Sequence, residues 1–552
     1  MINYISAFLM TFGAFAMTAN AQTPKDSALN RTVVVENQYN PEVMDASKIN
    51  VLPKVEEPAV PKAEINYATS ARPMTGWEVV PMELISNEMK QTGAYRGYLR
   101  AAYGNLNNAD AKLSYLWDIT PQDRLGVMGS FYGRYGDIPS FNETPDEWKS
   151  RFFKTDVALD YRHQFRKLAL TLGGSFASQV FNYMPIADVD SKTAFSGSQH
   201  FTWGEGYVGI ESVEKEFPVV FALQTGFCGF SRKQAIPYLP DFSEKSIHTL
   251  GYVSGALNDQ QSVGIGFEMD NLMYDKPYKN FTLLQLNPYY QLKDENLSLR
   301  VGAHVDLQKG NDGGIEVAPD VKLDYTFSDT YVFYLHATGG ATLNDFRRLN
   351  EFSPYAMPVA QLQKSYTQVD AQAGLKGSPM AGMNFKVFGG YQITKDDLFA
   401  IPAASVEESA YYYTGVAQEK AKVGYGGVAL SYAYKDWFDF AVDGTYYGWS
   451  MDEANEYLLA LKPQFSVNAT LRAKIMDNLH VDAGYRYEGR VDVDGVGKAD
   501  AVSNLSVSAT YEFLNRINVF VRTDNLLNQD YITETGYPVQ GLTVMGGISL
   551  RF

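Results

Sequence analysis

The sequence predicts an all-β protein, mostly a closed transmembrane antiparallel β-barrel of about 22 strands, within a range of roughly 16 to 24. Three observations lead to this fold. The chain opens with an apolar stretch that ends in small residues, it alternates apolar and polar residues from about Gly93 to its last residue, and its predicted strands are joined by short and long connections in turn. Alternation with a period of two indicates strands with two unlike faces.

Composition favours crossing a membrane with strands. Charged residues make up 20% of the chain and the mean hydropathy is only -0.24. After the first residues no stretch reaches the ~20 consecutive apolar residues that a spanning helix needs. A closed barrel also satisfies every backbone polar group in lipid, and its alternating strands keep the mean hydropathy low.

The first part of the chain has a different organisation from the rest. Ile5 to Met17 is an apolar run, and Ala19-Asn20-Ala21 is a small-x-small cleavage site, so residues 1–21 are predicted to be a signal peptide. The segment before the run lacks Lys and Arg, and a buried N-terminal helix is the alternative. Residues 22–90 include the proline-rich stretch 51–62 and are predicted to be an irregular periplasmic tail, followed by the barrel at 91–552.

The alternating segments sort into an apolar and a polar face. In 296–308, for example, Leu299, Val301 and Val305 share one face, and charged residues lie on the other. A lumen lined by such charges would be hydrated and crossed by ion pairs. The charged residues predicted to line the lumen are Arg300, Asp306, Asp482, Arg486, Glu488 and Arg490.

The connections distinguish a membrane barrel from a soluble β-sandwich. Short turns on one side and long loops on the other are typical of outer-membrane barrels, with the turns in the periplasm and the loops outside the cell. The predicted short turns are 121–123, 166–167, 259–261, 294–295, 328–330, 435–436 and 476–478. The predicted long loops are about 136–150, 185–196, 346–363, 398–414 and 531–542.

Several classes of function lack support in the sequence. Cys228 is the only cysteine and is predicted at an apolar strand position, which excludes disulfides and thiolate metal sites. The six histidines are scattered without a carboxylate at ligand spacing, so no metal site and no cofactor are expected. A net charge of -16 argues against nucleic acid as a partner. No Gly-x-Ser-x-Gly elbow or Ser/His/Asp grouping is present, so the chain is not expected to be an enzyme.

Aromatic residues gather near predicted strand ends. Tyr411-Tyr412-Tyr413 and Tyr446-Tyr447 are the clearest groups. Rings at this position are typical of the aromatic girdles at the two membrane surfaces, and exposed loops rich in tyrosine are the alternative.

The last strand is the most specific feature. Val544, Ile548 and Leu550 alternate with polar or small residues, and the chain ends on Phe552. A terminal aromatic on an amphipathic strand resembles the signal that the outer-membrane assembly machinery reads, so these four residues are predicted to be that signal.

The segment before this strand carries a family resemblance. Residues 521–531 read VRTDNLLNQDY, and Gly536-Tyr537-Pro538 and the closing GGISLRF follow. This looks like the end of TonB-dependent receptor barrels, with Leu527 in place of the usual Phe, and the overall style resembles proteins of Bacteroidota. Receptors of that family carry a plug domain before the barrel, for which residues 22–90 leave too little room.

The resemblance implies residence among the lipids of a Gram-negative outer membrane and transport of small solutes. The alternative is a barrel that transports nothing and docks periplasmic or lipoprotein partners in an envelope complex. The short β-prone run Thr32, Val33, Val34 and Val35 is a candidate coupling or partner peptide, and a locally paired strand is the other interpretation. Because a lumen of this size would breach the membrane, loops, the tail or another protein must fill it.

Overall fold

A computed structural model describes residues 95–140, 147–186, 198–213, 219–234, 241–275, 277–311, 313–328, 330–357, 361–404 and 411–552. The predicted signal peptide, the predicted tail and the run from Thr32 to Val35 lie outside these residues.

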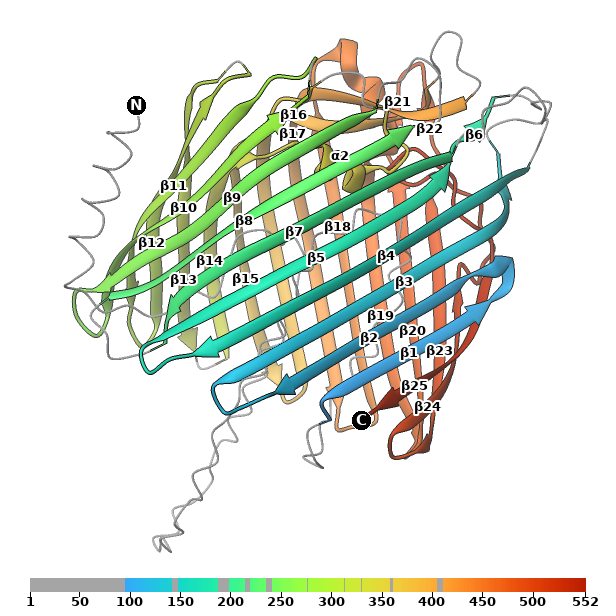
Figure 1. Cartoon of the computed structure of the whole chain (residues 1–552), viewed down its shortest axis with the longest axis horizontal. Helices are drawn as coiled ribbons and strands as arrows, with labels where there is room; N and C mark the ends of the chain where they lie inside the picture. The colour runs from blue at the N-terminus through green and yellow to red at the C-terminus, as the bar shows by residue number, and fades with distance from the viewer. Residues whose placement is uncertain are drawn as a thin grey trace, which may run out of the picture.

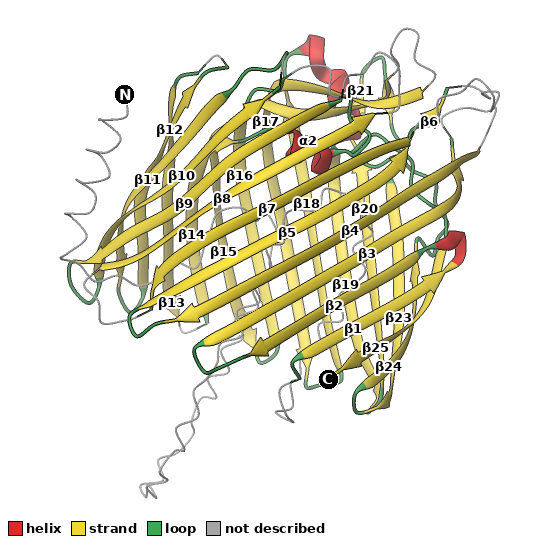
Figure 2. Ribbon diagram, in the orientation of Figure 1, coloured by secondary structure: helices red, strands yellow, loops and turns green. Residues whose placement is uncertain are grey.

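Twenty-two strands form one closed antiparallel barrel, as predicted (Figures 1 and 2). Each strand pairs with the next along the chain, and the ring closes where β1 pairs with β25, with Ala101 opposite Ile548. The strands are β1 (Gly97–Gly104), β2 (Ala109–Asp118), β3 (Asp123–Pro139), β4 (Glu147–Gln164), β5 (Leu168–Asn182), β7 (Ser198–Ser212), β8 (Val219–Gln234), β9 (Phe242–Ala256), β10 (Gln261–Tyr274), β11 (Phe281–Lys293), β12 (Leu297–Lys309), β13 (Ile315–Ser328), β14 (Tyr331–Thr342), β15 (Ser365–Met380), β16 (Met383–Ala404), β17 (Tyr411–Tyr434), β18 (Phe438–Ser450), β19 (Pro463–Met476), β20 (Leu479–Arg490), β23 (Val502–Leu514), β24 (Ile517–Asp524) and β25 (Thr543–Arg551).

The connections carry a few short elements. Strand β6 (Met184–Pro185) pairs with the start of β17, and β21 (Asp492–Val493) pairs with β22 (Gly497–Lys498). The helices are η1 (Asn105–Asn107), α2 (Phe346–Phe352) and η2 (Glu453–Leu461). No helix among the described residues has the length and apolarity needed to cross a membrane.

Short and long connections lie at opposite ends of the barrel, which we call the short-turn end and the long-loop end. All seven predicted short turns fall between strands as expected. The prediction of a loop over 398–414 was too long, because β16 continues to Ala404 and β17 begins at Tyr411. These strands have 22 and 24 residues, well beyond the ~9–11 that cross a bilayer, so they rise above the membrane at the long-loop end.

The two faces of the strands differ as the alternation predicts. Leu159, Phe176 and Val428 are about half exposed on the outside of the barrel. On β12, Val301 is 46% exposed whereas Asp306 is completely buried. An apolar outer surface with polar groups turned inward is the arrangement that a lipid bilayer requires.

Candidate functional site

The loop between β14 and β15, residues 343–364, crosses the inside of the barrel. At one end of the described part, Phe346 packs on Phe242 of β9 with ring centroids 4.2 Å apart. At the other end, Thr414 of β17 donates its backbone N–H to the carbonyl of Tyr355 at 2.9 Å, and Met357 donates to Thr414 at 3.1 Å. Since β9 and β17 are not neighbours in the ring, a loop that binds both of them spans the lumen (Figure 1).

Helix α2 forms the first part of this loop and is fixed by its own cap. Asp345 stands at the N-cap position, and its carboxylate accepts the backbone N–H of Arg348 at 2.7 Å. This satisfies one of the amide groups that a helix N-terminus leaves unbonded. The helix then places Phe346 and Leu349 against the wall of the barrel, where both are buried.

Aromatic side chains from the wall and from three loops meet around this helix and form one hydrophobic core inside the long-loop half of the barrel. We call it the lumen core. Tyr355 is at its centre, stacked on Tyr537 and touched edge-on by Trp148 at 6.0 Å. Its buried residues are Ile138, Trp148, Phe152, Ala177, Phe181, Tyr183, Met184, Phe201, Trp203, Phe230, Phe242, Phe346, Leu349, Tyr355, Ala356, Met357, Tyr411, Tyr413 and Tyr537. An aromatic ring buries about 150–250 Å² on packing, so this is a substantial core.

Burial changes the acidity of the tyrosines that the loops contribute. It raises the pKa of Tyr183 to about 12, with Arg232 acting in the opposite direction and Tyr413 and Tyr355 adding to the rise. The pKa values of Tyr355 and Tyr537 are also raised, mainly by burial. The phenols therefore stay neutral at physiological pH, which an apolar core requires.

Two charged side chains of the wall hold the loop in place. Arg232 of β8 is 3% exposed and donates to the carbonyl of Ala356 at 3.0 Å and to the hydroxyl of Tyr183. Its guanidinium also lies 4.6 Å from the ring centre of Phe201, a cation–π contact. At the start of α2, the carboxylate of Glu244 accepts the backbone N–H of Phe346 at 2.8 Å.

Arg347 connects α2 to the wall at a third point. Its guanidinium lies 3.6 Å from the sulfur of Cys228 and 3.8 Å from the carboxylate of Glu205. Cys228 is 6% exposed, so it faces the lumen, whereas its neighbour Phe227 is half exposed on the outside. The alternation predicts the strand position of Cys228 correctly but contains no sign that a charged group covers it.

The final long loop, residues 525–542, supplies Tyr537 and is shaped by its asparagines. Asn525 has a φ of 47°, and its side-chain amide donates to the carbonyls of Gln529 and Gln540, both at 2.9 Å. Asparagine tolerates this left-handed conformation better than most residues. Gly536 has a φ of +83°, and an added Cβ there would lie 3.2 Å from Thr414. These positions fold the loop back so that Tyr537 enters the lumen core.

Solved structures share this architecture. The ferric enterobactin receptor PfeA from Pseudomonas aeruginosa matches with a TM-score of 0.63 and 12% identity, covering 83% of this chain and 81% of that chain. The siderophore receptor PirA from Acinetobacter baumannii matches with a TM-score of 0.64 and 12% identity over 84% and 81% of the two chains. The copper transporter OprC gives 0.61 and 11%, covering 83% of each chain. These neighbours are TonB-dependent receptors, and this chain shares the fold of their barrels. No protein-family model and no curated protein sequence matches the chain.

In this barrel the six charges predicted to line the lumen are held by residues of nearby strands and, for Arg490, also by a loop. Arg300 donates to Asp320 on the next strand at 2.8 Å and lies 3.8 Å from the ring centre of Tyr289. Asp306 accepts the backbone N–H of Ala341 at 2.8 Å. The expected ion pairs across the lumen do not occur for these two residues, because partners one or two strands away are much closer than the opposite wall.

The other predicted lumen charges lie on β20. Asp482 is 4% exposed and lies 3.4 Å from Arg472 of β19. Arg486 donates to Glu488 on the same strand at 2.8 Å. Arg490 is completely buried, lies 3.4 Å from Glu488, and donates to the carbonyl of Ile532 in the final loop at 3.1 Å. Arg490 thus connects the wall of the barrel to the loop that carries Tyr537.

The girdle interpretation of the tyrosine groups was wrong for the first group. Tyr411 and Tyr413 are 6% and 1% exposed and belong to the lumen core. They face inward because β17 begins where the loops fold into the barrel. Tyr446 is 55% exposed on the outer surface.

The four residues of the predicted assembly signal lie on the closing strand. Val544 and Ile548 are 39% and 58% exposed, and Leu550 is partly buried. Phe552 exchanges backbone hydrogen bonds with Gly97, at 2.7 and 3.0 Å, and stacks on Tyr115 with ring centroids 5.9 Å apart. The terminal residue therefore helps to close the barrel seam.

The sequence shows no carboxylate at ligand spacing from any histidine, but the structure places carboxylates beside three of them, His163, His248 and His336. Nδ1 of His248 lies 2.7 Å from Asp270 and 4.0 Å from Glu268, and His163 lies 2.6 Å from Asp123. Asp270 is directly opposite His248 in the pairing of β9 with β10. Residues on neighbouring strands meet through the register, which the linear spacing of the sequence does not show.

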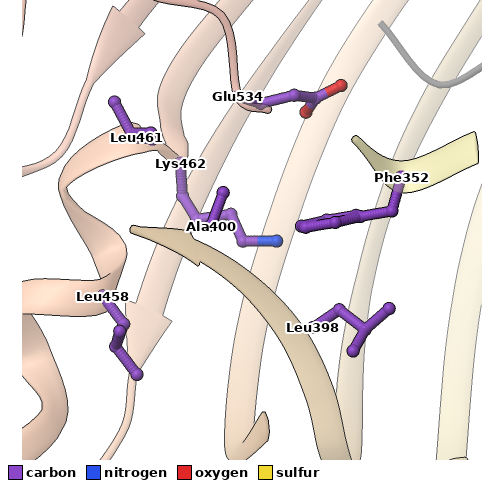
Figure 3. Close-up of a pocket in the computed structure, with 7 residues that line it drawn as sticks. All are labelled: Phe352, Leu398, Ala400, Leu458, Leu461, Lys462 and Glu534. Atoms are coloured by element: carbon purple, nitrogen blue, oxygen red, sulfur yellow. The ribbon is translucent and has the colours of Figure 1, made fainter. Parts of the chain in front are cut away.

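A small hollow lies between the long-loop connections. Lys462 points toward Phe352, with Leu398 and Glu534 on either side (Figure 3). Its volume of about 30 Å³ has room for one or two water molecules only. It is therefore a packing gap between loops and not a site for a solute.

Most residues of the lumen core cannot be found from the sequence. The alternation places Trp148, Phe181 and Phe201 on strands, but it also predicts a polar inner face, so inward aromatics contradict the simple pattern. Inward aromatic residues do not mark this core by themselves, because Tyr289 and Tyr334 are also buried on the wall toward the short-turn end.

Proposed function

We propose that the chain is a transport barrel of the Gram-negative outer membrane, exported by the signal peptide 1–21 and closed at its outer end by its own loop 343–364. The observation that carries the proposal is the lumen core, in which Tyr355 of this loop stacks on Tyr537 of the final loop inside the long-loop half of the barrel, where the two loops would form a seal. Long loops lie outside the cell in barrels of this type, so the seal faces the exterior.

The physical need for the seal follows from the strand number. A barrel of 22 strands encloses a lumen that must be filled to keep the membrane a barrier. Here the lumen core occupies the long-loop half, and the short-turn half keeps a polar wall that includes Arg300 and Asp482. A passage forms when the loop moves aside, and the wall charges then select among solutes.

The kind of solute is inferred from the solved structures that share this fold. They are described as receptors for ferric enterobactin and siderophores and as a copper transporter. At 11–12% identity we extend only transport of small solutes to this chain, and no catalytic role is assigned.

Conductance in planar bilayers tests this function. The wild-type protein is expected to be closed most of the time with brief openings. The double variant Tyr355→Ala, Tyr537→Ala is expected to conduct steadily because its core is loosened, and Tyr446→Ala, which changes an outward tyrosine, is expected to behave as wild type. Folded double-variant protein that passes no current would contradict the proposal.

The second candidate is a scaffold barrel that docks periplasmic or lipoprotein partners. It is favoured by the same lumen core, because a barrel that transports nothing must be sealed permanently. Stoichiometric co-purification of partners, lost when residues 22–75 are deleted, would support it. A steady current from the loosened variant with no wild-type openings would favour the scaffold over the transporter.

Two further assignments belong to this proposal. Val544, Ile548, Leu550 and Phe552 would be read by the assembly machinery as the protein enters the membrane lipids. The run from Thr32 to Val35 would bind a coupling or periplasmic partner.

A further inference from the structure

We propose that His248, Glu268 and Asp270 form a binding site for a divalent transition-metal ion on the inner wall of the barrel. The three residues come from two adjacent strands, and their ligand atoms all lie within 4.8 Å of one another. The inference does not depend on whether the barrel transports solutes.

The sheet register creates the site. Glu268 and Asp270 are two residues apart on β10 and share a face, and His248 of β9 lies directly opposite Asp270. A residue opposite one member of such a pair is also within diagonal reach of the other. Ile247, the neighbour of His248, is 40% exposed on the outer surface, so the histidine points into the lumen.

The distances suit a metal ion. Zinc binds imidazole nitrogen and carboxylate oxygen at roughly 2.0–2.2 Å, which in tetrahedral coordination separates neighbouring ligand atoms by about 3.3–3.6 Å. Nδ1 of His248 lies 2.7 Å from Oδ1 of Asp270 and 4.0 Å from Oε1 of Glu268, so small side-chain rotations bring all three to that spacing. One imidazole with two carboxylates leaves a coordination position open toward the lumen.

The two carboxylates of the site also have too few positively charged and hydrogen-bonding partners. Among the described residues, the carboxylate of Glu268 accepts no hydrogen bond, and its one ion-pair contact is with His248. Asp270 has a side chain only 8% exposed and shares the same histidine. Arg347 of the loop lies 3.8 Å from Glu205 and 4.0 Å from Asp345, so its charge is already paired. Two carboxylates therefore share one imidazole, and a divalent ion would balance them.

The site has a matched comparison within the same barrel. His336 of β14 also lies beside a wall carboxylate, Asp324, at 3.3 Å. There Lys376 takes the place of a second carboxylate, 3.5 Å from Asp324. A histidine paired with one carboxylate and a lysine lacks the charge and the ligand number that a divalent ion needs.

Zinc and cobalt binding to the untagged full-length chain in detergent tests the proposal. Isothermal titration with Zn²⁺ is expected to show one ion per barrel, and Co²⁺ is expected to give a visible absorption band that Zn²⁺ removes. Glu268→Gln and Asp270→Asn are expected to weaken binding at least about 10-fold and His248→Ala to abolish it, while His336→Ala binds as wild type. Heat-modifiable migration in gels confirms that each variant is folded.

Glu268→Gln carries the test if the other variants fail to fold, because it keeps the shape of a side chain that forms no hydrogen bond within the described structure. The absence of stoichiometric binding to the wild-type protein would overturn the proposal. Undiminished binding by folded Glu268→Gln would also overturn it, as would an equal loss in His336→Ala.

Discussion

Tyr355 and Tyr537 stack face to face inside the barrel, with ring centroids 3.9 Å apart and ring planes 11° apart, although they belong to loops separated by most of the last third of the chain. Each ring is completely buried. The pair joins the loop that crosses the lumen to the loop that precedes the final strand. For one of these loops to move out of the lumen, its tyrosine must therefore separate from the tyrosine of the other loop.

The stacked pair gives a measurable coupling. Tyr355→Ala and Tyr537→Ala are each expected to speed the reaction of Cys228 with a bulky thiol reagent by about 10-fold or more, because each loosens the loop that covers this cysteine. In a double-mutant cycle the two changes are expected to couple by about 0.5–1.5 kcal/mol. Cys228 is the only cysteine in the chain, so the rate of modification reports one site. Strict additivity would show that the stack does not hold the loops together.

Arg347 should hold α2 against the wall. Arg347→Met keeps much of the side-chain volume but leaves the carboxylates of Glu205 and Asp345 without their shared cation. We expect Cys228 to react roughly 10-fold faster, the effect of about 1.4 kcal/mol, and Arg347→Lys to fall between this variant and the wild type. An unchanged rate in Arg347→Met would mean that α2 is held by its apolar contacts alone.

Alkaline pH should loosen the lumen core. Because burial raises the pKa of Tyr183 to about 12, folding favours its neutral form. The stabilisation is complete below the unfolded pKa of about 10 and is lost as the pH rises toward 12. Absorbance at 295 nm is expected to show a late-titrating group of tyrosines, together with a rise in bilayer conductance between pH 10 and 12. The idea fails if all tyrosines ionise in one step near pH 10.

Asn525 should control the placement of Tyr537. Asn525→Ala removes three side-chain hydrogen bonds and strains a residue whose φ is 47°, whereas Asn525→Gly removes the bonds but permits the conformation. We expect faster proteolysis within 525–542 for both variants, with alanine having the larger effect. Equally fast proteolysis of the two variants would mean that the hydrogen bonds of Asn525, and not its backbone conformation, place Tyr537. Unchanged proteolysis in both variants would contradict the prediction.

The terminal residue should matter for assembly more than for stability. Deletion of Phe552 removes the residue whose backbone bonds Gly97 at the seam, and it is expected to reduce the amount of folded barrel in the outer membrane several-fold. Tyr115→Ala removes the stacking partner of Phe552 but leaves the chain end intact, so it is expected to assemble almost as well as wild type. Equal losses in both variants would attribute the effect to the seam contact and not to a recognition signal.

The sequence alone determined the barrel. Strict alternation in segments such as 296–308 and the contrast between short and long connections predicted a closed sheet with an apolar exterior, and a count of the alternating segments gave about 22 strands. These are local properties, because a two-residue period and a turn each depend on residues close together in the chain. For the same reason the alternation by itself assigns Arg300, Asp306 and Asp482 to the inner face.

Only the tertiary structure decided what fills the barrel and which residues meet there. Tyr355, Tyr537 and Arg232 come from distant segments, and nothing in their local sequence distinguishes an inward loop from an outward one. His248 and Asp270 became neighbours through the pairing of β9 with β10, a relation fixed by hydrogen bonds between strands. Alternation specifies which face of a strand is polar, but the register and the path of the loops depend on contacts made across the whole barrel.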